Sequence, residues 1–224
     1  GGNCWFDAMQ LEEGLTLNHF NMVQNSDFSV SGTDGQPKAW TVGNNSNSYV
    51  SVLPLADEKD IFHAPDCLKH DNTQKIHLLG RYDRTVTYYQ QFRHYGKIGD
   101  RFTVGGWCSS FAKKNDPDNY IYCRITVLFT AGNPDNANCY WATGGSAVFN
   151  AEEGNWQFAS AGIVAPNNCT YIRVVLQMNR QMNFADFTGI YLYPEAFGTQ
   201  YIYDKNGNRK TRKMLYGGQE KSEF

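Results

Sequence analysis

The stretch Tyr120–Thr130, YIYCRITVLFT, decides the fold, because its apolar and polar residues alternate as they do in a half-buried β-strand. The side expected to face the core carries Ile121, Cys123, Ile125, Val127 and Phe129. The opposite, wet side carries Tyr120, Tyr122, Arg124, Thr126 and Thr130. We interpret this segment as the central strand of a sheet. Tyrosine and arginine are unusual cover for a water-facing side, so this side is the first place to look for a ligand.

Working outward, strand patterns bounded by turn residues recur along the chain, with no helical pattern among them. They are Trp40–Val42, Tyr49–Leu53, 75–80, 84–92, 101–111, 139–150, 155–164, 170–178 and 184–194. The Asn- and Gly-rich link at 42–48 predicts a hairpin-like turn between the first two. The Gly105-Gly106 pair predicts a bulge or a close backbone approach. The sequence therefore predicts an all-β protein, an antiparallel β-sandwich of jelly-roll type with about ten strands.

Length and composition narrow the function classes. The 224 residues suit one ordinary β domain, and 15% aromatic residues favour an ordered core. A formal charge of −2 provides no basic field for a polyanion, so we expect no nucleic-acid partner and interpret the basic run Arg209–Lys213 as solvated. No apolar run approaches the roughly 18 residues needed to cross a bilayer, so we expect no membrane insertion.

The six cysteines do not form a metal-binding pattern, since no CxxC pair and no histidine at zinc-ligand spacing accompanies them. Cys108 and Cys123 lie within strand patterns, and we expect them to be small buried hydrophobic residues. Cys139 and Cys169 lie in turn-rich surroundings, where they can pair if the compartment is oxidising.

The two ends of the chain differ from its middle. The segment 4–14 has the same strand spacing as 184–194, with Phe6 matching Phe187 and Leu11 matching Leu192. Beyond Gly198 the composition becomes polar and basic around an Asn-Gly hairpin signal. We therefore expect a closing strand of a preceding module plus linker at 1–19, one complete module at 20–197, and the start of a further region or a flexible tail at 198–224.

Three landmarks in order resemble a known family: NSDFSVSG at 25–32 followed by Trp40, FTVGGWCSSFAKK at 102–114, and the long stretch from 154 to 194. They resemble the carbohydrate-binding-module-like jelly rolls of galactose-binding-like type, found in large surface proteins of Gram-positive bacteria. YIYDKNGNRKT at 201–211 resembles the start of a YD repeat of Rhs-type wall-associated proteins. The resemblance implies a secreted or cell-wall-associated multi-module protein, in which the sandwich binds glycan or spaces its neighbouring modules.

The family also implies a structural calcium, held by acidic residues after the first turn and in the closing strand. Here Ser29 and Gly189 stand in those places, and Asn25, Asp27 and Asp186 are the remaining oxygen donors. No cofactor is firmly predicted, and calcium is the candidate.

A sugar site needs an aromatic platform together with amide or guanidinium groups of fixed direction. If the strands share one sheet, their wet faces and the loop before 142 supply both. The predicted ligand-binding residues are Tyr89, Gln91, Tyr122, Arg124, Trp141, Arg173 and Gln177. The alternative is that these side chains cover one another in cross-strand and cation–π pairs with no ligand. Trp40, Trp107 and Trp156 are expected in the core or between the sheets.

Catalysis is not predicted. The acidic and histidine residues that suggest acid–base chemistry lie in polar loop segments without a nucleophile motif: Asp57, Glu58, Asp60, His63, His70, Glu152 and Glu153. The sequence favours a non-catalytic module that binds a polysaccharide or a glycoprotein glycan weakly, at micromolar to millimolar concentrations. The alternative function is a spacer or protein-interaction module that presents the Rhs/YD repeats without a sugar.

Overall fold

The computed structural model of the chain describes residues 21–43, 46–55, 73–81, 83–111, 122–136, 138–151, 154–179 and 183–195, and the strand backbone at 198–203, 209–216 and 219–221. The predicted closing strand at 4–14, most of the polar segment before Thr73, and residues 120–121 lie outside these ranges.

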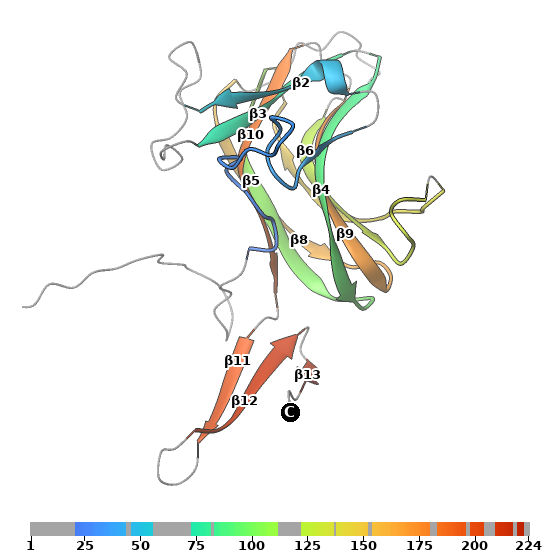
Figure 1. The fold of residues 1–224 in the computed structure, drawn as a ribbon, viewed down its shortest axis with the longest axis vertical. Coiled ribbons are helices and arrows are strands. Elements are labelled where there is room, and N and C mark those ends of the chain that lie inside the picture. Colours follow the sequence, from blue (N-terminus) through green and yellow to red (C-terminus); the bar gives the residue numbers. More distant parts are fainter. Residues whose placement is uncertain are drawn as a thin grey trace, which may run out of the picture.

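Two antiparallel five-stranded sheets face each other (Figure 1). The first sheet contains, in spatial order, β1 (Thr41–Val42), β4 (Thr85–Gly96), β9 (Cys169–Asn179), β6 (Tyr122–Thr130) and β7 (Ala142–Phe149). The second sheet contains β2 (Val50–Pro54), β3 (Gln74–Leu79), β10 (Phe184–Pro194), β5 (Arg101–Phe111) and β8 (Gln157–Val164). The chain is an all-β sandwich of jelly-roll type, as predicted, with one 3-10 turn, η1 (Asn47–Tyr49).

Most connections cross from one sheet to the other. From β4 to β10 the chain changes sheet at every step except the hairpin between β6 and β7. β1 and β2 also lie in different sheets, so the predicted hairpin-like turn between them is wrong. The prediction of a central strand is wrong as well, because β9 occupies the centre and β6 lies beside it. The sheet that a strand joins and its place in that sheet depend on pairing with strands far away in the sequence. A local sequence pattern does not encode this pairing.

The predicted alternation of inward and outward side chains in β6 is confirmed for the inward residues that the structure describes. Cys123, Ile125, Val127 and Phe129 are fully buried between the sheets. Each large apolar side chain buried in this way contributes about 1.5–3 kcal/mol to folding. On the opposite side, Thr126 is also buried, because neighbouring side chains cover it.

Trp40 is buried in the core, as predicted. Its ring stacks on Tyr88 with centroids 5.7 Å apart and meets Phe28 edge-on at 5.0 Å. The buried Gln90 side chain ties the chain near Trp40 to β4, since it both accepts from Gln24 N and donates to Gln24 O at 2.8 Å. The loop at 21–40 is thereby fixed against the first sheet.

Trp107 does not lie in the core, which corrects the prediction. It points to the outer face of the second sheet, where its ring lies 5.4 Å from the half-exposed Phe158. The alternation within β5 explains this position, because its neighbour Cys108 takes the inward place. Trp156 is also only partly buried, just before β8.

The described cysteines are free thiols. Cys108 and Cys123 are fully buried, as expected, and their sulfur atoms meet between the two sheets at 3.2 Å. Cys139 and Cys169 are not paired. The Cys139 Sγ lies 3.2 Å from Thr130 Oγ1, whereas the Cys169 Sγ lies 3.7 Å from the carbonyl oxygen of His94.

The glycine pair in β5 marks both expected features. The register between β5 and β10 shifts between Thr188 and Tyr191, so the bulge lies in β10, where Gly189 has a φ of 61°. A Cβ on Gly105 would lie 2.3 Å from the Tyr191 hydroxyl, so this close approach requires glycine.

A third, smaller sheet follows the sandwich in the sequence. β11 (Gly198–Tyr203) pairs antiparallel with β12 (Arg209–Tyr216), which pairs with β13 (Gln219–Lys221). The extended segments predicted around the Asn-Gly signal are confirmed, while their assignment to a YD repeat stays a prediction. Among the described residues, no helix has the length and apolar character needed to span a membrane.

Candidate functional site

The outer face of the first sheet brings together polar side chains from three neighbouring strands. Antiparallel pairing sets Gln91 of β4 opposite Arg173 of β9, and Arg124 of β6 opposite Gln177 of β9. Because side chains alternate along each strand, all four project away from the core. The expectation that these strands share one sheet is confirmed.

Arg173 is held from three sides. Its guanidinium carbon lies 4.4 Å from the centroid of the Tyr89 ring and 4.0 Å from that of the Trp141 ring, within the range of cation–π contacts. Its Nη2 and Nε donate to Gln91 Oε1 at 2.6 and 3.2 Å. Burial lowers the pKa of Arg173, although the nearby Tyr89 and Cys139 oppose this shift. The guanidinium nonetheless stays charged at neutral pH.

Gln177 is fixed at the other end of this face. Its Oε1 accepts from Arg124 Nε and from Thr126 Oγ1, both at 2.9 Å. Arg124 in turn lies 3.9 Å from the centroid of the Tyr122 ring. With the oxygen committed to two donors, the orientation of the amide is set, and its NH2 group makes no hydrogen bond within the described chain.

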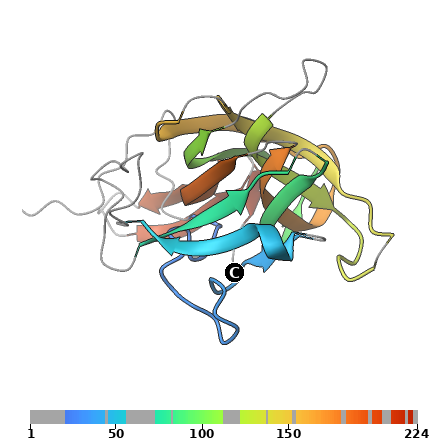
Figure 2. The ribbon, with the colours of Figure 1, turned by 90° about the horizontal axis from the view of Figure 1, so that it is seen from above.

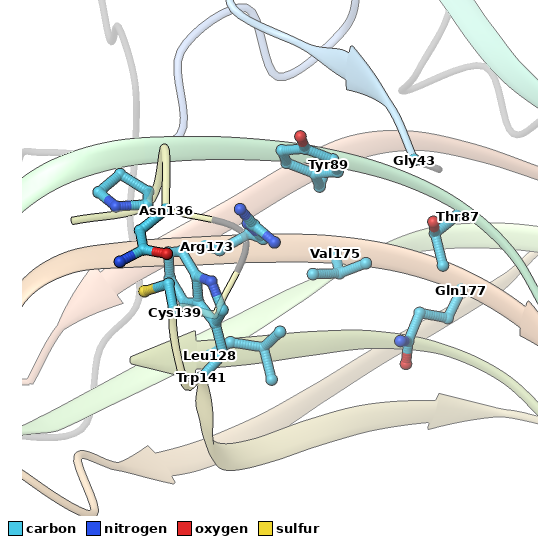
Figure 3. A pocket seen from close by; sticks show the side chains of 11 residues that line it. Gly43, Thr87, Tyr89, Leu128, Asn136, Cys139, Trp141, Arg173, Val175 and Gln177 are labelled. Carbon is cyan, nitrogen blue, oxygen red and sulfur yellow. The ribbon is translucent and has the colours of Figure 1, made fainter. Parts of the chain in front are cut away.

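A pocket of about 460 Å³ runs along the face between Arg173 and Gln177 (Figure 3). It is within the size range of small-ligand sites. The strands supply its floor and walls, and the loop between β6 and β7 supplies one rim. Its lining residues are Gly43, Thr87, Tyr89, Leu128, Pro134, Asn136, Cys139, Trp141, Arg173, Val175 and Gln177.

The rim loop at 131–141 is ordered by its own hydrogen bonds. Asn136 N donates to Asn133 O at 3.1 Å, and Cys139 N donates to Asn136 O at 2.9 Å. Thr130 Oγ1 accepts from Gly132 N at 3.0 Å. Figure 2 shows this yellow loop projecting beyond the sandwich. These turns place the Trp141 ring against the Arg173 guanidinium, just before β7 begins.

Four of the seven predicted ligand-binding residues line the pocket: Tyr89, Trp141, Arg173 and Gln177. The other three, Gln91, Tyr122 and Arg124, lie outside the lining. Gln91 holds Arg173, and Arg124, packed on Tyr122, holds Gln177.

Sequence reasoning missed several lining residues. Thr87 and Leu128 lie on the wet sides of β4 and β6, so strict alternation alone could have found them. Val175 follows from the same alternation, because it lies between Arg173 and Gln177 on β9, and it forms part of the pocket floor. No local signal identified Gly43 or Asn136, because their positions depend on sheet order and on loop geometry.

The residues proposed for calcium do not fit a cation. The Asn25 Nδ2 donates to Val30 O at 2.8 Å, and its Oδ1 accepts from Val30 N. Asp27 Oδ1 caps the turn at Ser29. Asp186, on the central strand of the second sheet, is paired with a lysine and a histidine, and the described residues contain no cluster of three or more metal-ligating side chains.

The outer face of the second sheet holds a buried ionic group that the sequence did not suggest. Asp186 Oδ2 lies 3.1 Å from Lys75 Nζ, and Asp186 Oδ1 lies 2.7 Å from His77 Nδ1. Lys75 and Asp186 are almost fully buried. The register that sets His77 opposite Asp186 could not be read from either segment alone.

The loop residues considered for acid–base chemistry, Asp57, Glu58, Asp60, His63, His70, Glu152 and Glu153, lie outside the described residues. The described residues that line the pocket include no aspartate, glutamate or histidine.

No protein-family model and no curated protein matches this sequence. Solved structures with similar folds include the enzymatically active domain of tailspike protein 4 from bacteriophage CBA120, with a TM-score of 0.48 and 12% identity over 77% of this chain and 21% of that chain. The CBM22-2 xylan-binding domain of Paenibacillus barcinonensis Xyn10C matches with a TM-score of 0.47 and 14% identity over 75% of this chain and 97% of its own.

A third similar structure is TmCBM61 in complex with β-1,4-galactotriose, with a TM-score of 0.42 and 14% identity over 78% of this chain and 99% of that chain. Because all three TM-scores are below 0.5 and the identities are low, the function of this chain has to be inferred from its own pocket.

Proposed function

We propose that this chain contains a non-catalytic carbohydrate-binding module, which binds a glycan in the pocket on the first sheet. The observation that carries this proposal is the combination of aromatic rings and fixed polar donors around one hollow of about 460 Å³. Sugar rings present C–H faces that pack on aromatic rings and hydroxyl groups that need donors and acceptors. Tyr89 and Trp141 meet the first need, and Arg173, Gln177 and Thr87 meet the second.

Preorganisation supports this proposal. Gln91 and two rings hold Arg173, and Arg124 and Thr126 hold Gln177, before any ligand arrives. A ligand therefore loses little affinity to the ordering of protein side chains. With few contacts in an open pocket, we expect micromolar to millimolar dissociation constants, and repeated modules would act through avidity.

The pocket lining argues against catalysis at this place. Glycoside hydrolysis uses a pair of carboxylic side chains flanking the bond, and no such side chain lines the described part of the pocket. Cys139 also lines the pocket, and its described polar neighbours, the Thr130 hydroxyl and the Arg173 guanidinium, are not general bases. These features suit retention of a saccharide without chemical change.

The wider context belongs to the same proposal. We place the module at 20–197, between the closing strand of an upstream module at 1–19 and the beginning of a YD-repeat region at 198–224. The parent protein would be a secreted or cell-wall-associated Rhs-type surface protein of a Gram-positive bacterium. Its partners would be polysaccharides or glycoprotein glycans and the adjacent modules.

A glycan array of plant, host and bacterial-wall saccharides, probed with the full chain, tests the function. Titration calorimetry then compares the wild type with Trp141→Ala. We expect loss of the Trp141 ring to weaken binding about tenfold, or about 1.4 kcal/mol. Trp107→Ala is the matched control, since Trp107 is a partly exposed tryptophan on the other sheet, and it should leave affinity unchanged.

One observation favours the alternative of a spacer without a sugar ligand. The Tyr89 and Trp141 rings both lie against Arg173, so part of the aromatic surface is already covered by the protein itself. Silence across the array, with calcium and with chelator alike, would support the spacer. Equal loss of affinity in both tryptophan variants would show that binding occurs elsewhere.

A further inference from the structure

The five strands of the first sheet contain arginines but no aspartate or glutamate. Three arginines project from the pocket face of the first sheet, Arg93 and Arg124 beside the pocket and Arg173 within it. Each lies over aromatic rings. Among the described residues, no aspartate or glutamate lines the pocket, and Asp135 in the rim loop is exposed to solvent and lies outside the lining.

Among the described residues, Lys75, Arg81 and Arg84 have carboxylate partners, whereas Arg173, like Arg93 and Arg124, has none. Of these last three arginines, Arg173 lines the pocket. Arg81 and Arg84 share Asp83 at 3.2 and 2.9 Å, and Lys75 pairs with Asp186. Arg173 is half-buried, yet its hydrogen-bond acceptor is the neutral Gln91 amide. The groups that counter the effect of burial on its pKa are the Tyr89 and Cys139 side chains, neither of which is a carboxylate.

A partly desolvated cation without a counter-charge favours an anion that arrives from outside. The guanidinium has five N–H donors in one plane, and Gln91 uses the Nε hydrogen and one Nη2 hydrogen. The remaining Nη1 and Nη2 hydrogens form a fork that matches the two oxygens of a carboxylate. The hydrogen bonds of Arg173 within the described chain both go to Gln91, and the contacts with Tyr89 and Trp141 are ring contacts rather than hydrogen bonds.

The pocket continues beyond Arg173 over an apolar floor of Val175 and Leu128 toward Gln177. Arg173 and Gln177 are four residues apart on one strand, about 13 Å. A single sugar ring does not span this distance, so a charged ring at Arg173 and a following ring near Gln177 fit the pocket together.

We propose that the ligand of this pocket is an acidic oligosaccharide, in which Arg173 binds the carboxylate of a uronic acid and Gln177 donates to a hydroxyl of a neighbouring ring. This assignment rests on the proposed glycan-binding function and specifies its ligand class. It predicts selection by charge at one end of the pocket and by hydroxyl geometry at the other.

The test uses pairs of oligosaccharides that share a backbone and differ in the acid group: methyl-esterified with free oligogalacturonate, mannan with oligomannuronate, and xylan with glucuronoxylan. Titration of the full chain at low salt should show at least tenfold tighter binding of an acidic member over its neutral partner. Raising the salt from about 0.05 to 0.5 M should reduce this preference several-fold.

Three variants separate the mechanism from a general charge effect. Arg173→Gln should abolish the preference, and Arg173→Lys, which keeps the charge but loses the fork, should retain only part of it. Arg93→Gln removes a charge from the same face outside the pocket and should leave the preference intact. A thermal melt of each variant verifies that the fold is retained.

The outcomes are distinct. If neutral members bind as well as acidic ones, or if Arg173→Gln keeps the preference, the acidic ligand is excluded while the glycan-binding function stands. If sulfated saccharides bind and uronates do not, the carboxylate assignment is wrong. If no saccharide of either kind binds, the proposed function itself fails.

Discussion

Each sheet of the sandwich has a buried or half-buried basic side chain on its outer face, but the two side chains contact different kinds of partner. On the second sheet, Lys75 meets Asp186 at 3.1 Å, and His77 completes the group. On the first sheet, Arg173 meets a neutral amide and two aromatic rings. Lys75 therefore has a counter-charge within the protein, and our proposal for Arg173 is that a ligand supplies it.

The largest effect is expected from Asp186→Asn. This change removes the carboxylate charge that Lys75 contacts at 3.1 Å, and breaking a buried pair in this way costs about 3–5 kcal/mol. Urea unfolding would measure the loss. Asp83→Asn is the control, because the pairs of Asp83 with Arg81 and Arg84 are exposed and such pairs contribute little. Equal effects of both changes would contradict this view of the second sheet.

Arg173→Met should affect binding far more than stability. The change removes a cation that has no carboxylate partner, and the neutral Gln91 alone loses a donor, so the free energy of unfolding should stay within about 1 kcal/mol of the wild type. Binding of the saccharide should fall at least tenfold. A destabilisation as large as that of Asp186→Asn would mean that Arg173 is a structural residue.

Tyr88→Phe should stabilise the sandwich. The Tyr88 hydroxyl is buried and makes no hydrogen bond in the described chain, so its removal should gain about 1 kcal/mol. Burial raises the pKa of Tyr88 above its ordinary value of 10.0. Because ionisation is easier in the unfolded chain, the free energy of unfolding is unaffected by this group below pH 10 and falls as the pH rises toward the folded-state pKa.

The Phe variant should therefore lose less stability than the wild type above pH 10. Denaturant unfolding across that range measures the difference. Tyr95→Phe, at an exposed position on the same strand, should behave as the wild type does. An unchanged alkaline loss in Tyr88→Phe would refute the assignment.

The smallest effect concerns the thiols. Cys139, at the pocket rim, should react with iodoacetamide in the folded protein, whereas Cys108 and Cys123 should resist it because they are fully buried. Burial and the hydrogen bond to Cys123 also raise the pKa of Cys108. Peptide mass mapping would follow each site. Bound saccharide should slow the reaction of Cys139, and an unchanged rate would argue against occupancy of the pocket.

The sequence predicted the features that follow from the alternation of inward and outward side chains along a strand. The inward and outward sides of β4, β6 and β9 follow from a period of two, and this was enough to select Arg173, Gln177 and Tyr89 as neighbours on one face. It also predicted the strand segments and the sandwich, because turn residues separate them at regular intervals.

Features set by long-range packing could not be predicted from the sequence. β1 and β2 enter different sheets although the link between them has hairpin composition, and β9 rather than β6 takes the central place. Trp107 faces outward because Cys108 fills the inward position. The pairing of Lys75 with Asp186 depends on a register between strands more than a hundred residues apart, for which neither segment carries a local signal.

The most direct test of a glycan pocket on the first sheet compares the two sheets within one sample. In a ¹⁵N-labelled chain, the indole N–H resonances of Trp141 and Trp107 report on the first and the second sheet respectively. Titration with the tightest saccharide found on the array should shift the Trp141 resonance in a saturable way and leave Trp107 in place. A saturable shift of Trp107 with Trp141 unmoved would contradict the account.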